Sequence, residues 1–219
     1  WDSDEYFLMA QQFGSGEAIT AAAPYAYRVL TPWLVSRCCS DLQQGFLLLN
    51  LAAGAALAVL LVVWLRHFIS HAGVRLLMVA AYALQWHAPI RFVFYYPAYV
   101  DPLFQVFLLA ALIAGERLVS RPTLIAGLSY VVLTVVGTLA RETMLMVPAA
   151  GLLGAFAAWR TRGATGLRWP ARALITGLAA FAAVYLASTG ARAGYGFGDA
   201  VWLHLANKPI ESNVLAGVV

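Results

Sequence analysis

The chain has 219 residues, of which 62% are hydrophobic and 11% charged, and its formal net charge is +4. Soluble domains typically carry about 25% charged residues, so this composition excludes a protein whose surface faces water on every side. A pI near 9.3 would suggest a nucleic-acid partner for a soluble protein. Here the arginines lie at the ends of apolar runs, where membrane topology accounts for them, and no nucleic-acid partner is expected.

The apolar residues form long runs and do not alternate with polar ones, which favours helices over the short strands of a β-barrel. Because backbone amides in lipid must be hydrogen-bonded within the chain, we predict an all-α fold, a polytopic transmembrane helical bundle. The sequence opens at Trp1 and stops at Val219, so we interpret it as a fragment that lacks at least its natural N-terminus. The adjacent Cys38 and Cys39 say little about the redox compartment.

Residues 1–44 are predicted to form an outer segment with short interfacial helices. The pattern predicts an amphipathic helix over residues 4–13, ended by Gly14-Ser15-Gly16. A second helix is expected over residues 21–40, broken at Pro24 and Pro32, with aromatic side chains suited to the headgroup layer.

The bundle itself is expected to occupy residues 45–190, followed by a further outer segment over residues 191–219. Several of its spans are shorter than the roughly 20 residues that a perpendicular crossing needs. We predict about six spans, at residues 45–65, 73–90, 102–115 (with Tyr99 as an alternative start), 122–140, 144–159 and 173–188.

Charge is distributed unequally between the two sides of this predicted bundle. Loops after the first, third and fifth spans carry eight basic residues and one acid, Glu116. The basic residues are Arg66, Arg75, Arg117, Arg121, Arg160, Arg162, Arg168 and Arg172. This Lys/Arg bias places those loops in the cytoplasm. The other nine acids fall on the outer side, which indicates that polar chemistry occurs there.

Three outer segments gather ionisable or tyrosine side chains: residues 1–6, residues 91–102, and Arg141-Glu142. Ionisable residues near membrane depth are costly unless they are paired or face water, so they are functional candidates. No His/Cys/Asp spacing fits a tetrahedral metal site, and no phosphate loop or dinucleotide fingerprint occurs.

Each segment also has a purely structural explanation. Asp101-Pro102 suits a helix start, with the aspartate as N-cap and proline at the first helical position. Arg141-Glu142 suits a solvated hinge, and the tyrosines of residues 91–99 suit an interfacial belt. The acids of residues 2–5 suit a helix N-terminus, although three acids within four residues exceed what capping needs.

Short motifs in these same segments resemble the GT-C glycosyltransferase superfamily, in particular the protein mannosyltransferase and aminoarabinose transferase relatives. These polytopic enzymes use lipid-phosphate-linked sugars as donors. The similar stretches are Trp1-Asp2-Ser3-Asp4-Glu5-Tyr6-Phe7-Leu8-Met9-Ala10, Arg28-Val29-Leu30-Thr31-Pro32, Tyr99-Val100-Asp101-Pro102-Leu103 and Leu139-Ala140-Arg141-Glu142-Thr143 with Pro148. The resemblance covers about residues 1–150.

The resemblance implies inverting transfer of a sugar from a polyprenyl-phosphate donor to a lipid, glycan or protein acceptor. The expected place is the outer face of a bacterial inner membrane. It also implies a catalytic base in the first outer loop, for which Asp2 and Asp4 both fit and Glu5 comes next. No domain for acceptor recognition is evident in residues 1–219, so the acceptor stays open.

Such a reaction needs a carboxylate to take the proton of the acceptor hydroxyl and an arginine to hold the leaving phosphate. Glu142 is predicted to orient Arg141, and Asp101 to bind the acceptor or a divalent ion; no other cofactor is predicted. The candidate substrate-binding residues are Arg28, Arg91, Tyr95, Tyr96, Asp101, Arg141 and Glu142.

Two other functions fit a polytopic chain, a transporter or lipid flippase and a scaffold subunit. A transporter would place polar residues near the membrane midplane, whereas the charges here cluster at span ends. A scaffold would tolerate replacement of the outer acids.

Overall fold

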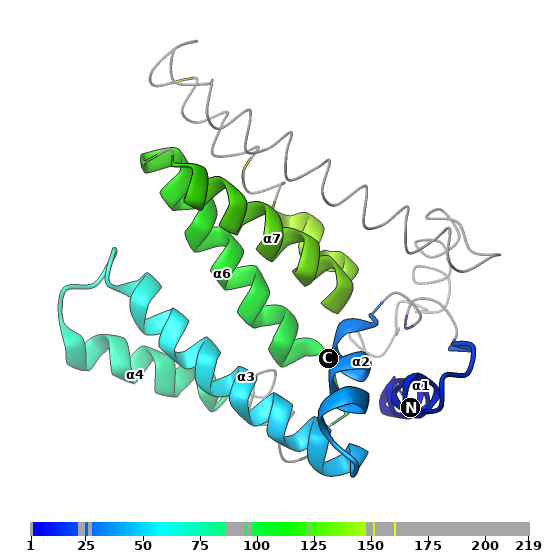
Figure 1. The fold of residues 1–219 in the computed structure, drawn as a ribbon. Coiled ribbons are helices and arrows are strands. Elements are labelled where there is room, and N and C mark those ends of the chain that lie inside the picture. Colours follow the sequence, from blue (N-terminus) through cyan, green and yellow to red (C-terminus); the bar gives the residue numbers. More distant parts are fainter. Residues whose placement is uncertain are drawn as a thin grey trace, which may run out of the picture.

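The computed structural model describes residues 2–21, 25, 28–85, 95, 98–121, 123–147, 151 and 160. Every regular element in these ranges is helical, which confirms the all-α prediction for this part of the chain. The elements are α1 (Asp2–Ser15), α2 (Leu30–Cys38), α3 (Leu42–Leu65), α4 (Ala72–Ala83), α6 (Asp101–Ser120), α7 (Leu124–Ala140) and the 3-10 helix η2 (Glu142–Leu145) (Figure 1).

Helix α6 packs between α3 and α7, and α4 runs back along α3 (Figure 1). Successive long helices therefore alternate in direction. One end of the bundle collects α1, α2, the starts of α3 and α6, and the end of α7. The other end collects the end of α3, the start of α4, the end of α6 and the start of α7.

The N-terminal segment follows its prediction in part. Helix α1 is longer than expected at both ends and stops before Gly16, whose φ of +76° is a conformation that glycine adopts readily. Tyr6, Met9 and Ala10 are buried on one face, at the spacing of a helix that packs against a core.

The second outer helix is shorter than predicted, because α2 begins only at Leu30. The expected break at Pro32 is wrong. Pro32 lies in the first turn of α2, where a backbone N–H has no partner within the helix, so its missing donor costs nothing. Pro24 lies outside the described residues.

The predicted spans find only partial counterparts. At 24 residues, or about 36 Å, α3 is the single helix among the described residues that is long and apolar enough to cross a membrane. Helices α4 and α7 are shorter, and α6 carries Asp101, Glu116 and Arg117. The described residues therefore do not amount to a six-span bundle.

Several boundaries also differ from the prediction. Helix α4 ends at Ala83, not at residue 90, while α6 continues five residues past the expected residue 115. Of the fifth expected span only residues 144–147 and 151 are described, and the sixth lies wholly outside the described residues.

Close helix contacts depend on two glycines. A methyl group at Gly45 of α3 would lie 2.8 Å from Val35 Cγ1 of α2. One at Gly137 of α7 would lie 2.7 Å from Met144 Cε and 3.0 Å from Phe107 Cβ of α6. These glycines let α2 approach α3, and let the turn after α7 fold back on α6 and α7.

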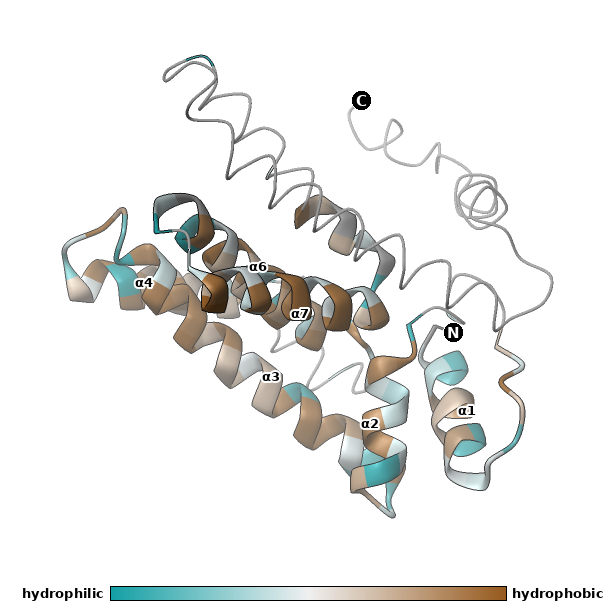
Figure 2. Ribbon diagram, turned by 45° about the horizontal axis from the view of Figure 1, so that its top comes forward, coloured by the Kyte–Doolittle hydropathy of each residue, from teal (hydrophilic) through white to brown (hydrophobic). Residues whose placement is uncertain are grey.

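The long helices are hydrophobic over much of their length (Figure 2), and many of their apolar side chains are exposed. Helix α4 has no buried residue, and its Leu76 and Leu77 are 60% and 70% exposed. Leu124 and Ile125 at the start of α7 are 78% and 77% exposed. These exposed apolar residues are neighbours and not single scattered ones, and apolar surface of this kind is typical of contact with lipid or protein.

Candidate functional site

Three segments that the sequence singled out meet at one end of the bundle. Tyr6 and Met9 of α1 share a hydrophobic cluster with Ala98 and Val100, directly before α6. Arg141, which follows the last residue of α7, reaches the first residue of α6. The packing thus brings α1, the segment at residues 98–101 and the α7–η2 turn to the same end of the molecule.

The centre of this end is an ion pair between the Asp101 carboxylate and the Arg141 guanidinium. Their side chains are only 17% and 25% exposed, and the guanidinium also lies 5.8 Å from the ring centroid of Phe104. Partial burial strengthens the attraction between the charges and restricts the orientation of the guanidinium.

The pairing corrects one expectation and leaves another as a prediction, that Glu142 orients Arg141. Asp101 is the first residue of α6 and Val100 is the N-cap, without a side-chain capping hydrogen bond, so the N-cap interpretation of Asp101 is wrong. Asp101 also provides a carboxylate partner for Arg141, a task that the sequence suggested for Glu142. Glu142 opens η2 next to Arg141, and its side chain lies outside the described part.

Arg28 is buried, with 4% of its surface exposed. Its Nη1 donates a 2.8 Å hydrogen bond to the Tyr6 hydroxyl, and its guanidinium lies 5.8 Å from the ring centroid of Tyr25. A buried cation needs such partners. These contacts favour a role in holding α1 in place over direct contact with a donor phosphate.

A tyrosine and an asparagine continue this network toward α6. The Tyr6 ring lies 6.3 Å from that of Tyr99 in an edge-to-face arrangement. Asn50, fully buried in α3, donates a 3.1 Å hydrogen bond to the Tyr99 carbonyl. Tyr99 is two residues before Asp101, so the network joins α1 and α3 to the segment that carries the ion pair.

Asn50 and this use of Tyr6 were missed from the sequence. A signal for Asn50 was present, because it is a polar side chain within an otherwise apolar stretch of α3, and polar groups in such stretches are costly unless bonded. The partner of Tyr6 had no such signal, since Arg28 is 22 residues away in the sequence.

The structure describes the other candidate residues in less detail. On α1, Asp4 is exposed and Glu5 half-buried, while for Asp2 only the helical backbone is described. Tyr95 is 69% exposed. Arg91 and Tyr96 lie outside the described residues.

Metal binding at this end remains a prediction. No group of three or more His, Cys, Asp or Glu side chains among the described residues is arranged to hold a metal ion. Asp101, the residue predicted to bind the acceptor or a divalent ion, forms an ion pair with Arg141.

No family model matches the chain, and no curated protein and no solved structure matches it either. The resemblance to GT-C enzymes therefore rests on the short motifs of residues 1–150 alone.

Proposed function

We propose that the chain is part of a polytopic membrane glycosyltransferase that uses a polyprenyl-phosphate-linked sugar. The observation that carries the proposal is the partly buried Asp101–Arg141 pair, at the same end of the bundle as the acid-bearing helix α1. Transfer needs both a carboxylate that accepts a proton as a base and a fixed cation that binds the leaving phosphate. This end of the molecule carries both kinds of group.

A membrane location accounts for the apolar surface. Helix α3 is long enough to cross the hydrocarbon core, and α4 and α7 expose leucines and isoleucines that would otherwise face water. In the proposed arrangement α3, α4, α6 and α7 all cross, with the shorter helices flanked by interfacial residues. Two further spans, at residues 144–159 and 173–188, belong to the same proposal.

Orientation follows from the arginines at the end opposite the ion pair. Arg66, Arg75, Arg117 and Arg121 lie in or beside short turns there, and a Lys/Arg excess in short loops favours the cytoplasmic side. The Asp101–Arg141 end would then face outward, in the proposed bacterial inner membrane. A donor with its lipid tail in the outer leaflet would present its sugar phosphate at that level.

The proposed reaction is a direct displacement at the sugar. The acceptor oxygen forms a bond to the anomeric carbon, and its proton passes to a carboxylate of α1, Asp2 or Asp4, with Glu5 as the next candidate. The bond from the anomeric carbon to the phosphate oxygen breaks, and its electron pair leaves with the polyprenyl phosphate. Attack opposite the leaving group inverts the anomeric configuration, as in the enzymes that the motifs resemble.

Arg141 would bind the departing phosphate. Its positive charge stabilises the negative charge that grows on the leaving oxygen, and such stabilisation is strongest where water is excluded. Asp101 holds the guanidinium in one orientation before the donor arrives, so less ordering is needed on binding. Arg91, Tyr95 and Tyr96 remain candidates for donor contacts, and Glu142 for a second contact to Arg141.

The test is a transfer assay with the full-length protein in vesicles, using a radiolabelled polyprenyl-phosphate sugar. We expect Asp2→Asn/Asp4→Asn to lose transfer while expression and unfolding temperature are retained. Glu17→Gln is the matched control, because Glu17 is an exposed acid just beyond α1. Unchanged turnover in the double variant would refute the assignment. Flux of labelled lipid across the membrane without sugar transfer would instead support the flippase alternative.

A further inference from the structure

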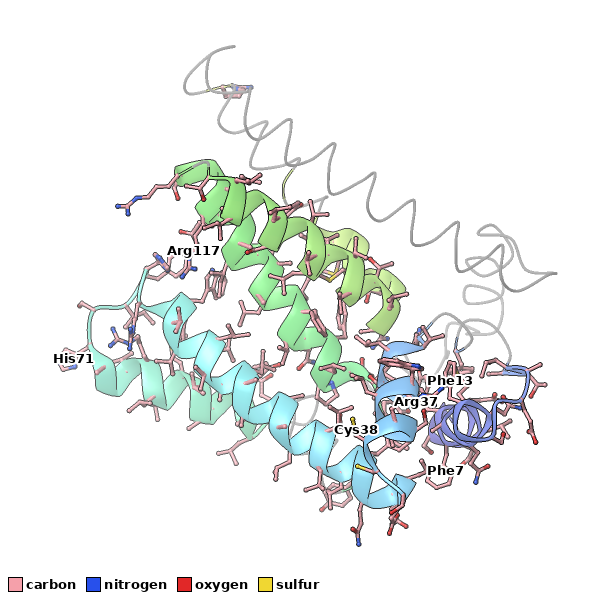
Figure 3. All side chains as sticks on the ribbon, viewed as in Figure 1. Phe7, Phe13, Arg37, Cys38, His71 and Arg117 are labelled. Atoms are coloured by element: carbon pink, nitrogen blue, oxygen red, sulfur yellow. The ribbon has the colours of Figure 1, made fainter. Side chains whose placement is uncertain are left out.

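The end of the bundle opposite the ion pair carries a second polar surface that sugar transfer does not use. We define this arginine surface by Arg66, Arg75, Arg117 and Arg121, which lie on the turn after α3, the start of α4 and the end of α6. Arg117 and His71 mark this end, far from Arg37 at the other end (Figure 3).

Polar contacts fix the turn between α3 and α4 and bring it against α6. Arg75 Nη1 donates to the carbonyl oxygens of Ile69 and Ser70, at 2.8 and 2.9 Å, which fixes the turn between α3 and α4. His67 Nε2 lies 3.9 Å from Glu116 Oε1, so the same turn also contacts α6.

The positive charge of this surface is poorly balanced. Glu116 is the only acid among the described residues 64–85 and 113–128, and it faces His67. Arg66, Arg117 and Arg121 are exposed, and no described side chain forms an ion pair with them. Like charges gathered in this way repel one another, and an anion bound between them would relieve that repulsion.

Exposed apolar side chains lie within four residues of these arginines in the sequence. Phe68 follows Arg66 by two residues, is 68% exposed, and packs edge-to-face on Trp64 with centroids 5.3 Å apart. The exposed pair Leu124 and Ile125 begins α7, three residues after Arg121. On α4, Leu76 and Leu77 follow Arg75 and are exposed in the same way.

We propose that the arginine surface binds the headgroup of an anionic phospholipid of the cytoplasmic leaflet, with its acyl chains on the apolar faces of α4 and α7. Cations bordered by exposed leucine, isoleucine and phenylalanine match a molecule that is anionic at one end and apolar at the other. An acidic protein segment would satisfy the charges alone and would leave these apolar faces uncovered. The inference rests on the membrane location proposed above and not on sugar transfer.

The experiment reconstitutes the full chain into nanodiscs of phosphatidylcholine and phosphatidylglycerol and measures by native mass spectrometry which lipids stay bound after detergent release. We expect wild type to retain phosphatidylglycerol in preference to phosphatidylcholine. Arg66→Gln/Arg117→Gln/Arg121→Gln should retain it at least about tenfold less, since each cation near an anionic lipid surface contributes to binding. Arg37→Gln, which removes an exposed arginine at the opposite end, should behave as wild type.

Retention of phosphatidylglycerol by the triple variant as by wild type would overturn the proposal, as would equal retention of the two lipids by wild type. The three single variants extend the test if the triple variant does not fold, because each should lose part of the retention. Added inorganic phosphate should not displace the lipid, whereas displacement by polyglutamate at equal charge concentration would identify an acidic-protein site instead. Sugar transfer is assayed in parallel in phosphatidylcholine alone, so a failed transfer assay leaves the lipid result readable.

Discussion

The two ends of the helical bundle differ in how far their charged and polar side chains are buried and paired. At the end that carries the Asp101–Arg141 pair, several polar groups are buried and paired: Arg28 with the Tyr6 hydroxyl, and Asn50 with the Tyr99 carbonyl. At the arginine surface Arg66, Arg117 and Arg121 are exposed, and the contact that links the turn to α6 is a half-exposed His67–Glu116 pair.

The first end therefore contains polar groups held in a fixed geometry, whereas the arginine surface does not. Burying a cation such as Arg28 is unfavourable unless each polar atom finds a partner, so a chain that buries one must fix several neighbours around it. Exposed arginines carry no such cost and need no fixed geometry. We therefore expect variants that remove a partner of a buried polar group at the first end to lower stability, and variants at the arginine surface to alter lipid binding with little effect on folding.

The largest effect is expected from Arg141→Gln. Glutamine removes the charge that would receive the leaving phosphate, and loss of one such group typically lowers turnover about 10²- to 10³-fold. The turnover number for sugar transfer is the quantity to measure. Arg141→Lys should recover only part of it, because an ammonium group cannot bind a carboxylate and a phosphate through a planar fork.

The control for this prediction is Arg66→Gln, which removes an arginine at the opposite end. It should leave turnover within about twofold of wild type, because substitutions of exposed residues usually change the free energy only slightly. Equal losses in the two variants would mean that the proposed contrast between the ends is wrong for catalysis.

Local elements were largely predictable from the sequence. The stop of α1 at Gly16, the long apolar α3 and the extent of α7 follow from glycine, hydropathy and capping signals that lie within a few residues. The prediction over residues 21–40 failed locally as well, because Pro32 was counted as a helix breaker when its position in the first turn makes it harmless.

Partners distant in sequence were not predictable in the same way. Asp101 and Arg141 were both singled out, yet their pairing depends on α6 and α7 lying antiparallel, with Gly137 allowing the following turn to pack closely. The contacts of Tyr6 with Arg28 and Tyr99 likewise depend on how α1 docks, which no local pattern encodes. The contrast between the two ends therefore follows from how the helices pack and not from local sequence patterns.

The next prediction tests the buried network by removing one atom. Tyr6→Phe deletes the hydroxyl that accepts from Arg28 while keeping the ring. We expect a loss of about 1–3 kcal/mol in the free energy of unfolding, because a buried charged donor loses an acceptor. The unfolding midpoint in detergent measures this loss. Equal midpoints for Tyr6→Phe and wild type would show that Arg28 does not depend on this bond.

Packing at the α6–α7 contact gives an effect of similar or smaller size. Gly137→Ala would place a methyl group 2.7 Å from Met144 Cε and 3.0 Å from Phe107 Cβ. Overpacking of this kind typically costs about 1–3 kcal/mol, and the flexible methionine should keep the cost toward the lower limit. Gly73→Ala is the control, because the added methyl group would meet no atom within 4 Å outside its own helix backbone and chain neighbours. A loss at Gly73 as large as at Gly137 would contradict the close approach.

The smallest effects compare one helix cap from each end. Asp41 Oδ1 accepts from the backbone N–H groups of Gln43 and Gln44 at the start of α3, at 2.9 and 3.2 Å, and Thr123 Oγ1 accepts from that of Ala126 at the start of α7, at 3.2 Å. Replacing either capping residue with alanine should cost about 1 kcal/mol, measured by the unfolding midpoint, while Asp41→Asn should cost less because it keeps an acceptor. Asp41→Ala should exceed Thr123→Ala, since its carboxylate accepts two hydrogen bonds and also carries a charge favoured at a helix N-terminus. The reverse order would show that the charge at the first end adds nothing to the cap.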